Sequence, residues 1–339
     1  MTTGNSTMVK IETHSGPLTD DIKSLAQSYE YKPYFFASAA TPDALNRMFI
    51  SRLEKFLIRC EASPDVIMFL ATDESGALVG FAGPECLDFD SAALNTPSGR
   101  LAFVVTKPGE YFDTRPIADA LVKASMEWLK GRGIVFTNIR TAALELPTIH
   151  AVESAGFYLV DNGFTAIYHK DNVPDYIKGS FDIRLFAEKD LPVVMEILAG
   201  AYHTDRFHLD PKIPKEAAEA LYKVWVHHSC MSPKDQEWVL IAERKGVVKG
   251  FFQYEYNHEF SEATGIGLFT YGPAAVVRDK TALGAYYSLL SFAINDSVMR
   301  GGTYAMTRIP FAIQPILKLT LRLGPSFMSN DLTFHHWVK

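Results

Sequence analysis

The feature that most constrains this chain is a pattern that occurs twice in its 339 residues. In residues 148–164, apolar side chains keep helical spacing up to Gly156, and beyond it apolar and polar residues alternate as in a strand. Glycine can adopt the left-handed conformation that ends a helix. The same order recurs around Gly324, which follows Gly156 by 324 − 156 = 168 positions. Closing a helix–strand pair near the middle and again at the end predicts two copies of one fold.

Two further features repeat at nearly the same spacing. Gly80 in ALVGFAG and Gly250 in VVKGFFQ are 250 − 80 = 170 positions apart. Two strand-to-helix junctions place Ala118 and Gly284 at a spacing of 284 − 118 = 166. Spacings that agree this closely indicate a duplication. We expect an N-terminal domain over residues 1–172 and a C-terminal domain over residues 173–339.

Length and composition support two soluble cores. A chain of 339 residues is long for one core and comfortable for two, and its 47% hydrophobic and 21% charged residues are typical of globular proteins. The net charge of −6 and the scattered Lys and Arg residues argue against a nucleic-acid-binding protein. The sequence contains no apolar run of a signal peptide or membrane span. Three cysteines without metal or redox spacing predict free thiols, a cytoplasmic location and no metal site.

The same order of elements is predicted in each half. The first half has helices at residues 18–29 and 41–59, strands at 66–72, 78–87 and 100–106, a helix at 115–130, a strand at 134–141, and the closing helix and strand. The second half has a strand at 181–186, helices at 191–202 and 214–229, strands at 238–244, 248–256 and 265–271, a helix at 280–299, a strand at 303–309, and a terminal helix and strand. Consecutive strands followed by strands alternating with helices predict a mixed α/β sheet.

This order of elements resembles the GNAT acyltransferase superfamily. In those proteins a central strand ends in a turn whose backbone amides, at a helix N-terminus, hold the pyrophosphate of coenzyme A. Residues 190–229 are similar to the corresponding region of bacterial dTDP-fucosamine-type sugar-amine acetyltransferases, and the similarity spans about residues 117–337. The resemblance implies two tandem GNAT-like domains and acetyl-CoA or another acyl-CoA as co-substrate.

The second copy has the better candidate phosphate loop. The first turn of a helix leaves N–H groups unpaired and carries a partial positive charge, and small residues let a phosphate approach. In the first copy, Thr114 could cap the helix beside Arg115, but Pro116 would remove one of these amides. Both copies depart from the family motif, with Asp113 and Asp279 where it has Gln or Arg. The predicted cofactor-binding residues are Leu268, Phe269, Thr270, Arg278, Lys280, Thr281, Ala282, Leu283, Gly284 and Ala285.

The catalytic residues must be sought away from the usual family position. Many family members have a tyrosine on the last helix that protonates the leaving thiolate, but the matching positions here are Val152 and Thr320. Tyr271 is the predicted replacement for that acid. Acyl transfer to an amine also needs a base, for which Glu255 is the candidate, with Tyr254 as an acceptor contact.

A segment between two predicted helices supplies the candidate acceptor site. In TDRFHLDPKIP, Arg206, His208 and Asp210 alternate, so an extended loop would present them on one side. An arginine fork suits a diphosphate, a histidine can exchange protons near neutral pH, and an aspartate can hold an amine or sugar hydroxyls. An Asp-Pro turn with solvated charges is the alternative interpretation.

Together these features predict a tandem GNAT protein whose second copy binds an acyl-CoA while the first is structural. The expected reaction transfers an acetyl or short acyl group to a primary amine of a small polar acceptor, such as a nucleotide-linked amino sugar. Two alternatives remain, a non-catalytic pair that serves as a ligand-binding or interaction module and acyl transfer from an acyl-carrier protein. Beyond the small-molecule amine, a homodimer and an acyl-carrier protein are the partners considered, without nucleic acid or membrane.

Overall fold

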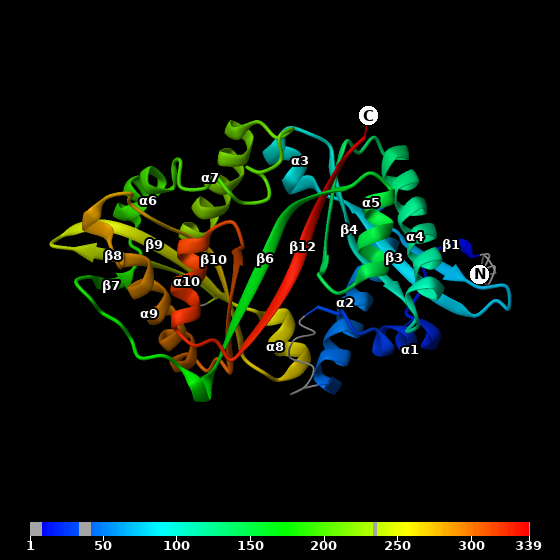
Figure 1. Cartoon of the computed structure of the whole chain (residues 1–339), viewed down its shortest axis with the longest axis horizontal. Coiled ribbons are helices and arrows are strands. Elements are labelled where there is room, and N and C mark those ends of the chain that lie inside the picture. Colours follow the sequence, from blue (N-terminus) through cyan, green and yellow to red (C-terminus); the bar gives the residue numbers. More distant parts are fainter. Residues whose placement is uncertain (1–8, 34–41, 233–235, 339) are drawn as a thin grey trace. The chain divides into compact units, whose positions relative to one another are not determined.

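A computed structural model describes residues 9–33, 42–232 and 236–338 of the chain (Figure 1). The chain forms two compact units: unit 1 contains Met1–Val160 and Asp331–Lys339, and unit 2 contains Asp161–Asn330. In the described ranges, no helix is long and apolar enough to cross a membrane.

Unit 1 is a mixed sheet between two helical layers. Its strand order is β1-β2-β3-β4-β5-β12, in which β4 and β5 run parallel. Helices α4 and α5 pack on one face and α1 and α2 on the other. Its elements are β1 (Lys10–His14), α1 (Asp20–Ser28), α2 (Pro42–Ala62), β2 (Met68–Thr72), β3 (Leu78–Cys86), α3 (Asp88–Leu94), β4 (Ser98–Thr106), α4 (Tyr111–Gly131), β5 (Phe136–Ala142), α5 (Leu146–Ser154) and the last residues of β12 (Phe327–Trp337).

Unit 2 has the same arrangement. Its strand order is β6-β11-β10-β9-β8-β7, in which β10 and β11 run parallel. Its elements are most of β6 (Tyr158–His169), η2 (Lys170–Asn172), β7 (Asp182–Leu185), η3 (Glu188–Asp190), α6 (Leu191–Leu198), α7 (Lys215–Met231), β8 (Glu237–Arg244), β9 (Val247–Tyr256), α8 (His258–Thr264), β10 (Leu268–Val276), η4 (Lys280–Ala282), α9 (Ala285–Met299), β11 (Tyr304–Pro310) and α10 (Gln314–Arg322).

The two sheets share one register. Every pair of β3 and β4 recurs in β9 and β10 exactly 170 positions later: Gly80↔Thr106 corresponds to Gly250↔Val276 (250 − 80 = 170; 276 − 106 = 170). The β-bulge in these pairs also lies at matching positions. A register that repeats with its irregularity confirms the predicted mixed sheets and the duplication behind them.

The last strand of each copy pairs in the other unit. Strand β12 pairs with β5 from Asp331↔Ala142 to Trp337↔Phe136, and β6 pairs with β11 from Gly163↔Pro310 to His169↔Tyr304. The boundary predicted after residue 172 therefore describes where the sequence copies meet, whereas the compact units exchange their final strands.

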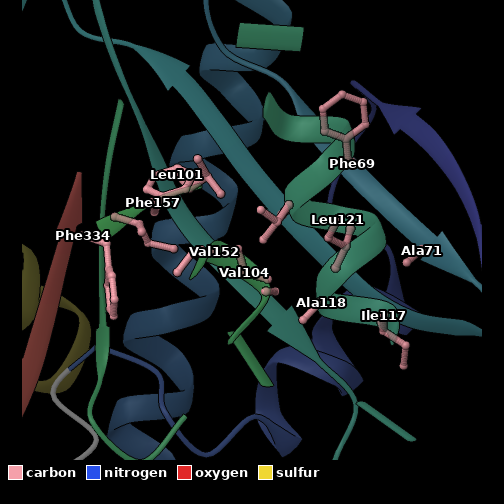
Figure 2. Packing of buried hydrophobic residues seen from close by; sticks show 14 of the residues in the cluster. Phe69, Ala71, Leu101, Val104, Ile117, Ala118, Leu121, Val152, Phe157 and Phe334 are labelled. Carbon is pink, nitrogen blue, oxygen red and sulfur yellow. The ribbon is translucent and has the colours of Figure 1, made fainter. Parts of the chain in front are cut away.

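Apolar packing holds α4 and α5 against the unit 1 sheet. Figure 2 shows Ile117, Ala118 and Leu121 of α4 beside Leu101 and Val104 of β4. These α4 residues are at most 1% exposed, as is the α5 residue Val152. Burying a side chain of this size contributes about 1.5–3 kcal/mol, so the amphipathic pattern that predicts α4 also attaches it to the sheet.

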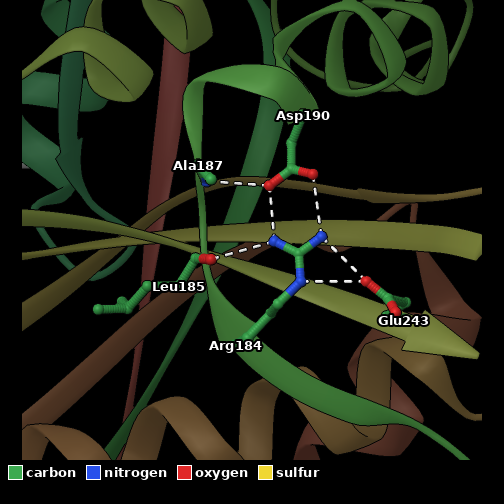
Figure 3. A network of polar contacts seen from close by, with 5 residues as sticks. All are labelled: Arg184, Leu185, Ala187, Asp190 and Glu243. Carbon is green, nitrogen blue, oxygen red and sulfur yellow. Dashed lines mark hydrogen bonds and ion pairs between the residues drawn. The ribbon is translucent and has the colours of Figure 1, made fainter. Parts of the chain in front are cut away.

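In unit 2, a partly buried ion-pair network holds the edge strand β7. Figure 3 shows the Arg184 guanidinium between Asp190 and Glu243. Its Nη1 and Nη2 donate to the two oxygens of Asp190 at 2.6 and 2.9 Å, and its Nε donates to Glu243 at 3.0 Å. These bonds hold the pKa of Asp190 below its usual value against the opposing effect of burial. The network joins η3 and β8 to the short strand β7.

Several predicted boundaries differ from the structure. The helix predicted over residues 280–299 is interrupted, because Gly284 adopts φ +88° and separates the short turn η4 from α9. Helix α4 begins at Tyr111 rather than near residue 115, so Ala118 lies inside it and does not correspond to the junction at Gly284. Strand β1 and helices α3 and α8 were not predicted. Thr41, the predicted start of the second helix, lies outside the described residues.

Candidate active site

The parallel strands of unit 2 separate part-way along their length. Pairing of β10 with β11 ends at Tyr271↔Thr307, although β10 continues to Val276 and β11 to Pro310. The bulge against β9 lies at the same point, between Tyr271 and Ala274. Beyond this point the backbone N–H of Ala274 donates to the Tyr202 hydroxyl at 2.8 Å and its carbonyl accepts from the same hydroxyl at 3.0 Å, so Tyr202 occupies part of the separation.

The loop after β10 leads to a helix start that suits an anion. Gly284 precedes α9, and within the described ranges the start of this helix has no side-chain cap hydrogen bond. The first N–H groups of a helix have no partner within it, and they attract anions. Arg278 and Lys280 add positive charge along the loop, where the Arg278 Nη2 donates to the carbonyl of Ala201 at 3.2 Å. This corrects the predicted position of the helix start, which lies at Ala285.

The carboxylate of Asp279 occupies part of the predicted phosphate loop. It accepts hydrogen bonds from the amides of Thr281 at 2.6 Å and Ala282 at 3.2 Å. Asp279 is the N-cap of the short turn η4, which contains Thr281. Those two amides are therefore already satisfied by this protein's own carboxylate, and the first turn of α9 is the remaining anion site.

The other predicted cofactor residues lie in three environments. Leu268 and Phe269 are buried in the paired part of β10. The Thr270 hydroxyl donates to Glu255 at 3.1 Å. Leu283, beside the start of α9, is 85% exposed, whereas Ala285 is fully buried. Of these residues, Leu283 is open to contact a ligand.

Tyr254 and Tyr271 face α9. Tyr254 is fully buried, and its hydroxyl donates to the Asp296 carboxylate on α9. The Tyr271 hydroxyl lies 3.2 Å from that of Ser297, also on α9. Burial raises the pKa of Tyr271 well above its ordinary value, opposed in part by the Ser297 hydrogen bond. Both phenols thus remain neutral parts of the interior packing beneath α9.

Glu255 points to the opposite face of the sheet. Alternate strand residues point to opposite faces, and Glu255 lies with residues of α7 in a hollow of about 400 Å³. Partial burial raises the pKa of Glu255; the Thr270 hydrogen bond opposes this, and the charge of Glu237 adds to it. The structure therefore does not bring Glu255 and Tyr271 to one place. The hollow is lined by His228, Met231, Ser232, Gln236, Glu237, Glu255, Tyr256 and His258.

The segment with Arg206, His208 and Asp210 forms turns, not the predicted extended loop. Asp210 is 1% exposed and accepts a hydrogen bond from the amide of Lys212 at 2.9 Å. The Nδ1 of His208 lies 2.5 Å from the Asp205 carboxylate, and the Arg206 guanidinium lies over the Phe207 ring. The expectation that the three side chains share one face was wrong, because local turns and short-range hydrogen bonds orient each one separately.

The described residues contain no group of three or more His, Cys, Asp or Glu that could hold a metal ion.

Comparison with solved structures shows which known fold this is. A GCN5-related N-acetyltransferase from Sphaerobacter thermophilus matches with a TM-score of 0.64 and 14% identity, over 97% of this chain and 95% of its own. A tandem GNAT protein from the clavulanic acid biosynthesis pathway matches with a TM-score of 0.56 and 13% identity, over 97% and 98%. The chain has a tandem GNAT fold. No protein-family model matches the sequence, and no curated protein matches it.

A third match covers only part of a longer protein. The glucosamine N-acetyltransferase region of a fungal multi-domain GH3 beta-N-acetylglucosaminidase matches with a TM-score of 0.60 and 12% identity. This chain is covered over 97% of its length, but only 38% of the fungal chain is matched. At such identities the likeness concerns the fold.

The positions that often hold tyrosine in this fold are inside the core. Val152 on α5 and Thr320 on α10 are both fully buried. The carbonyl of Thr320 accepts a hydrogen bond from the Tyr168 hydroxyl at 2.9 Å. Neither position presents an acid to a ligand.

Unit 1 closes its own strand separation with residues that the sequence interpretation missed. Pairing of β4 with β5 ends at Leu101↔Ile139. Beyond it, the Tyr29 hydroxyl lies 3.4 Å from the carbonyl of Val104 and 2.5 Å from the Glu145 carboxyl, which is itself buried. Hydroxyls of Thr141 and Thr148 also donate to this carboxyl. Burial raises the pKa of Glu145 to about 7 despite these three hydrogen bonds.

Unit 2 closes the matching position with a tyrosine but without a bridging acid. Glu145 precedes α5 as Ile313 precedes α10 (313 − 145 = 168). The counterpart of Tyr29 is Tyr202, whose hydroxyl bonds to the backbone of Ala274 at 2.8 and 3.0 Å. Unit 2 thus keeps the tyrosine but has an apolar residue in place of the bridging acid. A buried glutamate near a helix start gives no periodic signal in sequence, although its apolar neighbours on α5 could have drawn attention to it.

Proposed function

We propose that unit 2 is an acyl-CoA-dependent N-acyltransferase that moves an acetyl or short acyl group to a primary amine, and that unit 1 is structural. The observation that carries this proposal is the position of Glu255. Its carboxylate bonds to Thr270, which directly precedes the last β10 residue paired to β11, and it lines a hollow on the α7 face. A base thus lies beside the point where the strands separate.

The residues around α9 would hold the co-substrate. The pyrophosphate of an acyl-CoA would bind the first-turn amides after Gly284, with Arg278 and Lys280 as countercharges. The pantetheine arm would lie along the separated end of β10, where it would replace the Tyr202 hydroxyl at the backbone of Ala274. Unit 1 offers a poorer anion site, because Glu110 and Asp113 lie at the start of α4.

In the proposed reaction the amine nitrogen bonds to the acyl carbon, and the carbon–sulfur bond breaks. The acceptor ammonium first loses a proton to Glu255, directly or through water, and the carboxylate later releases that proton to solvent. A raised pKa brings a carboxylate closer to the range suited to a general base. The departing thiolate takes up a proton from solvent, because Tyr271, the predicted source, lies beneath α9 on the face opposite Glu255. Because Tyr271 lies under α9, we expect Tyr271→Phe to lower the rate less than Glu255→Gln.

The proposed reaction requires an acceptor that carries a primary amine. The sequence resemblance suggests a nucleotide-linked amino sugar, with Arg206 as its diphosphate contact, whereas the two glutamates of the hollow favour a different amine, one without a phosphate. Acyl transfer from a carrier protein would use the same Glu255 chemistry without the loop at α9. A non-catalytic pair would bind ligand and release no thiol.

Melting curves with acetyl-CoA test the co-substrate. A ligand at a hundredfold excess over its Kd stabilises the folded state by about 2.7 kcal/mol, which raises the Tm by roughly 5–10 °C. We expect Gly284→Asp to abolish this shift, because its carboxylate would repel the pyrophosphate. Gly284→Asn is the matched control, since asparagine has the same shape, tolerates a positive φ and carries no charge. An unchanged Tm at millimolar acetyl-CoA, or a shift that survives Gly284→Asp, would refute the proposed site.

A thiol-release assay then tests catalysis. Wild-type protein is expected to release thiol from acetyl-CoA with one or more amines from a panel of amino sugars, nucleotide-linked amino sugars, amino acids and polyamines. Glu255→Gln should lower this rate tenfold or more. Acetyl-CoA binding without thiol release for any amine would favour the non-catalytic or carrier-protein alternatives.

A further inference from the structure

The shared register of the two units shows which residues replace one another in the hollow. Glu255 in unit 2 corresponds to Glu85 in unit 1, and its cross-strand neighbour Thr270 corresponds to Arg100 (255 − 85 = 170; 270 − 100 = 170). Both glutamates are held at the same place in the sheet. Their surroundings can therefore be compared residue by residue.

In unit 1 this glutamate is neutralised. Glu85 is 2% exposed, and its carboxylate bonds to Arg59 and to the Nε of Arg100, the latter at 2.5 Å. Val66 lies directly across from Glu85 and forms an isolated β-bridge with it. A buried carboxylate is tolerated there because two arginines surround it.

In unit 2 the same carboxylate has lost its cations. Thr270 takes the place of Arg100, and His228 lies three residues before the end of α7, as Arg59 does in α2. Glu237, directly across from Glu255, takes the place of Val66. Two glutamates directly opposite each other repel. No ion pair within the described part of the chain joins either one to a cation.

Among the described residues, a buried acceptor without a donor belongs to Gln253, whose side chain contacts Glu237 of the hollow. Gln253 is 2% exposed, and its Nε2 donates to Glu237 at 2.8 Å. Its Oε1 has no hydrogen-bond partner among the described residues, and it lies against Gly272 in the bulge of β10. Leaving such an acceptor unpaired costs about 1–3 kcal/mol. The Nε2 of the same side chain holds the Glu237 carboxylate, which lines the hollow.

From this comparison we infer that the hollow of unit 2 binds the cationic amine acceptor, and that this acceptor is an aliphatic diamine or polyamine without a phosphate. The carboxylates of Glu237 and Glu255 present only acceptors to the hollow, and these complement an ammonium group that has only donors. The ligand's positive charge would replace that of the two arginines of unit 1. A phosphate group would be repelled by the two glutamates. This inference rests on the proposed function only in assigning the bound amine as the acyl acceptor.

A substitution that restores the unit 1 residue provides the sharpest test. In Thr270→Arg, the new guanidinium should pair with Glu255 and fill the site without removing either carboxylate. Thr270→Gln is the matched control, because it adds length without charge. We expect calorimetry with spermidine to show binding to wild-type protein and to Thr270→Gln, and at least a tenfold larger Kd for Thr270→Arg and Glu237→Gln.

The ligand panel separates the competing chemistries. Spermidine and 1,4-diaminobutane should bind more tightly than glucosamine or a dTDP-linked amino sugar, both with and without coenzyme A. The inference is overturned if the dTDP-linked sugar binds more tightly, if Thr270→Arg binds spermidine like wild type, or if only Zn²⁺ or Mg²⁺ binds at Glu237 and Glu255. Spermidine binding without an acetyl-CoA melting shift would leave this inference standing and refute the proposed function. The reverse result would refute this inference alone.

Discussion

Units 1 and 2 have the same backbone register but different side chains on the face that carries the first two helices of each unit. In unit 1, Phe103 packs against Phe56 and Phe81, and a Cβ at Gly83 would lie 2.4 Å from the Phe103 ring. In unit 2 the position of Gly83 is Gln253, and a Cβ at Gly272 would overlap its amide (253 − 83 = 170). In unit 1 the glycine lies on β3 and the large residue, Phe103, on β4. In unit 2 the glycine lies on β10 and the large residue, Gln253, on β9.

This exchange of large and small residues shows how two units with the same backbone can differ in their capacity to bind a ligand. The aromatic packing and the Arg–Glu pairs of unit 1 fill the space that in unit 2 remains a polar hollow. The strand separation of unit 1 is likewise closed by Tyr29 and Glu145. Because the backbone is shared, the difference in binding capacity resides in side chains, and substitutions can move one unit towards the other.

The largest expected effect concerns the buried acid that only unit 1 has. An unfolded glutamate has a pKa of about 4.3, and that of Glu145 is about 7. Between these values the folded state binds the additional proton, so stability falls as the pH rises from about 4.3 to 7 and then levels off. The expected loss is about 4 kcal/mol. Glu145→Gln should remove this dependence and melt above wild type at pH 8.

The measurement is Tm against pH for both proteins, with Glu255→Gln as the comparison from unit 2. Since Glu255 reaches solvent, its substitution should change the pH profile much less. Parallel wild-type and Glu145→Gln profiles would show that Glu145 ionises normally inside unit 1.

A somewhat smaller effect is expected when unit 1 is given the residue of unit 2. Arg100→Thr removes one of two guanidinium groups from buried Glu85, and loss of such a charged hydrogen bond costs about 1.5–3 kcal/mol. Chemical denaturation should show this loss. The control is Thr270→Gln in unit 2, which should change the free energy of unfolding by less than about 0.5 kcal/mol. Equal losses in the two units would mean that the carboxylates of Glu85 and Glu255 are equally well compensated.

The smallest expected effect concerns acetyl-CoA binding by variants of two matched surface residues, one at the start of α4 and one before α9. Phe112 on α4 and Leu283 before α9 are each 85% exposed, so an aspartate at either position should not disturb folding. We expect Leu283→Asp to weaken acetyl-CoA binding about tenfold, equivalent to about 1.4 kcal/mol, and Phe112→Asp to leave it unchanged. Fluorescence or calorimetric titration measures both. The opposite pattern would assign acyl-CoA binding to unit 1.

Much of the fold was predictable because its signals are local. Gly156 and Gly324 adopt positive φ angles after the helices they were predicted to end. The apolar spacing of α4 and the alternation in β9 likewise belong to single segments. Glu255 was proposed from its place beside the central strand, and the structure places it in a hollow there, although its catalytic role remains a prediction.

The contacts and strand pairings that could not be predicted from the sequence depend on residues far apart in the chain. Tyr29 and Glu145 meet across 116 positions, and the exchange of β6 and β12 between units is decided by strand pairing. The interruption at Gly284 was hidden because small residues on both sides of it are compatible with a continuous helix. Sequence alone determined the duplication, the order of elements and the mixed sheet, since periodicity and glycine act within a few residues. Only the tertiary structure decided which glutamate is neutralised and which faces an open hollow, because charge and burial depend on what the other segments bring into contact.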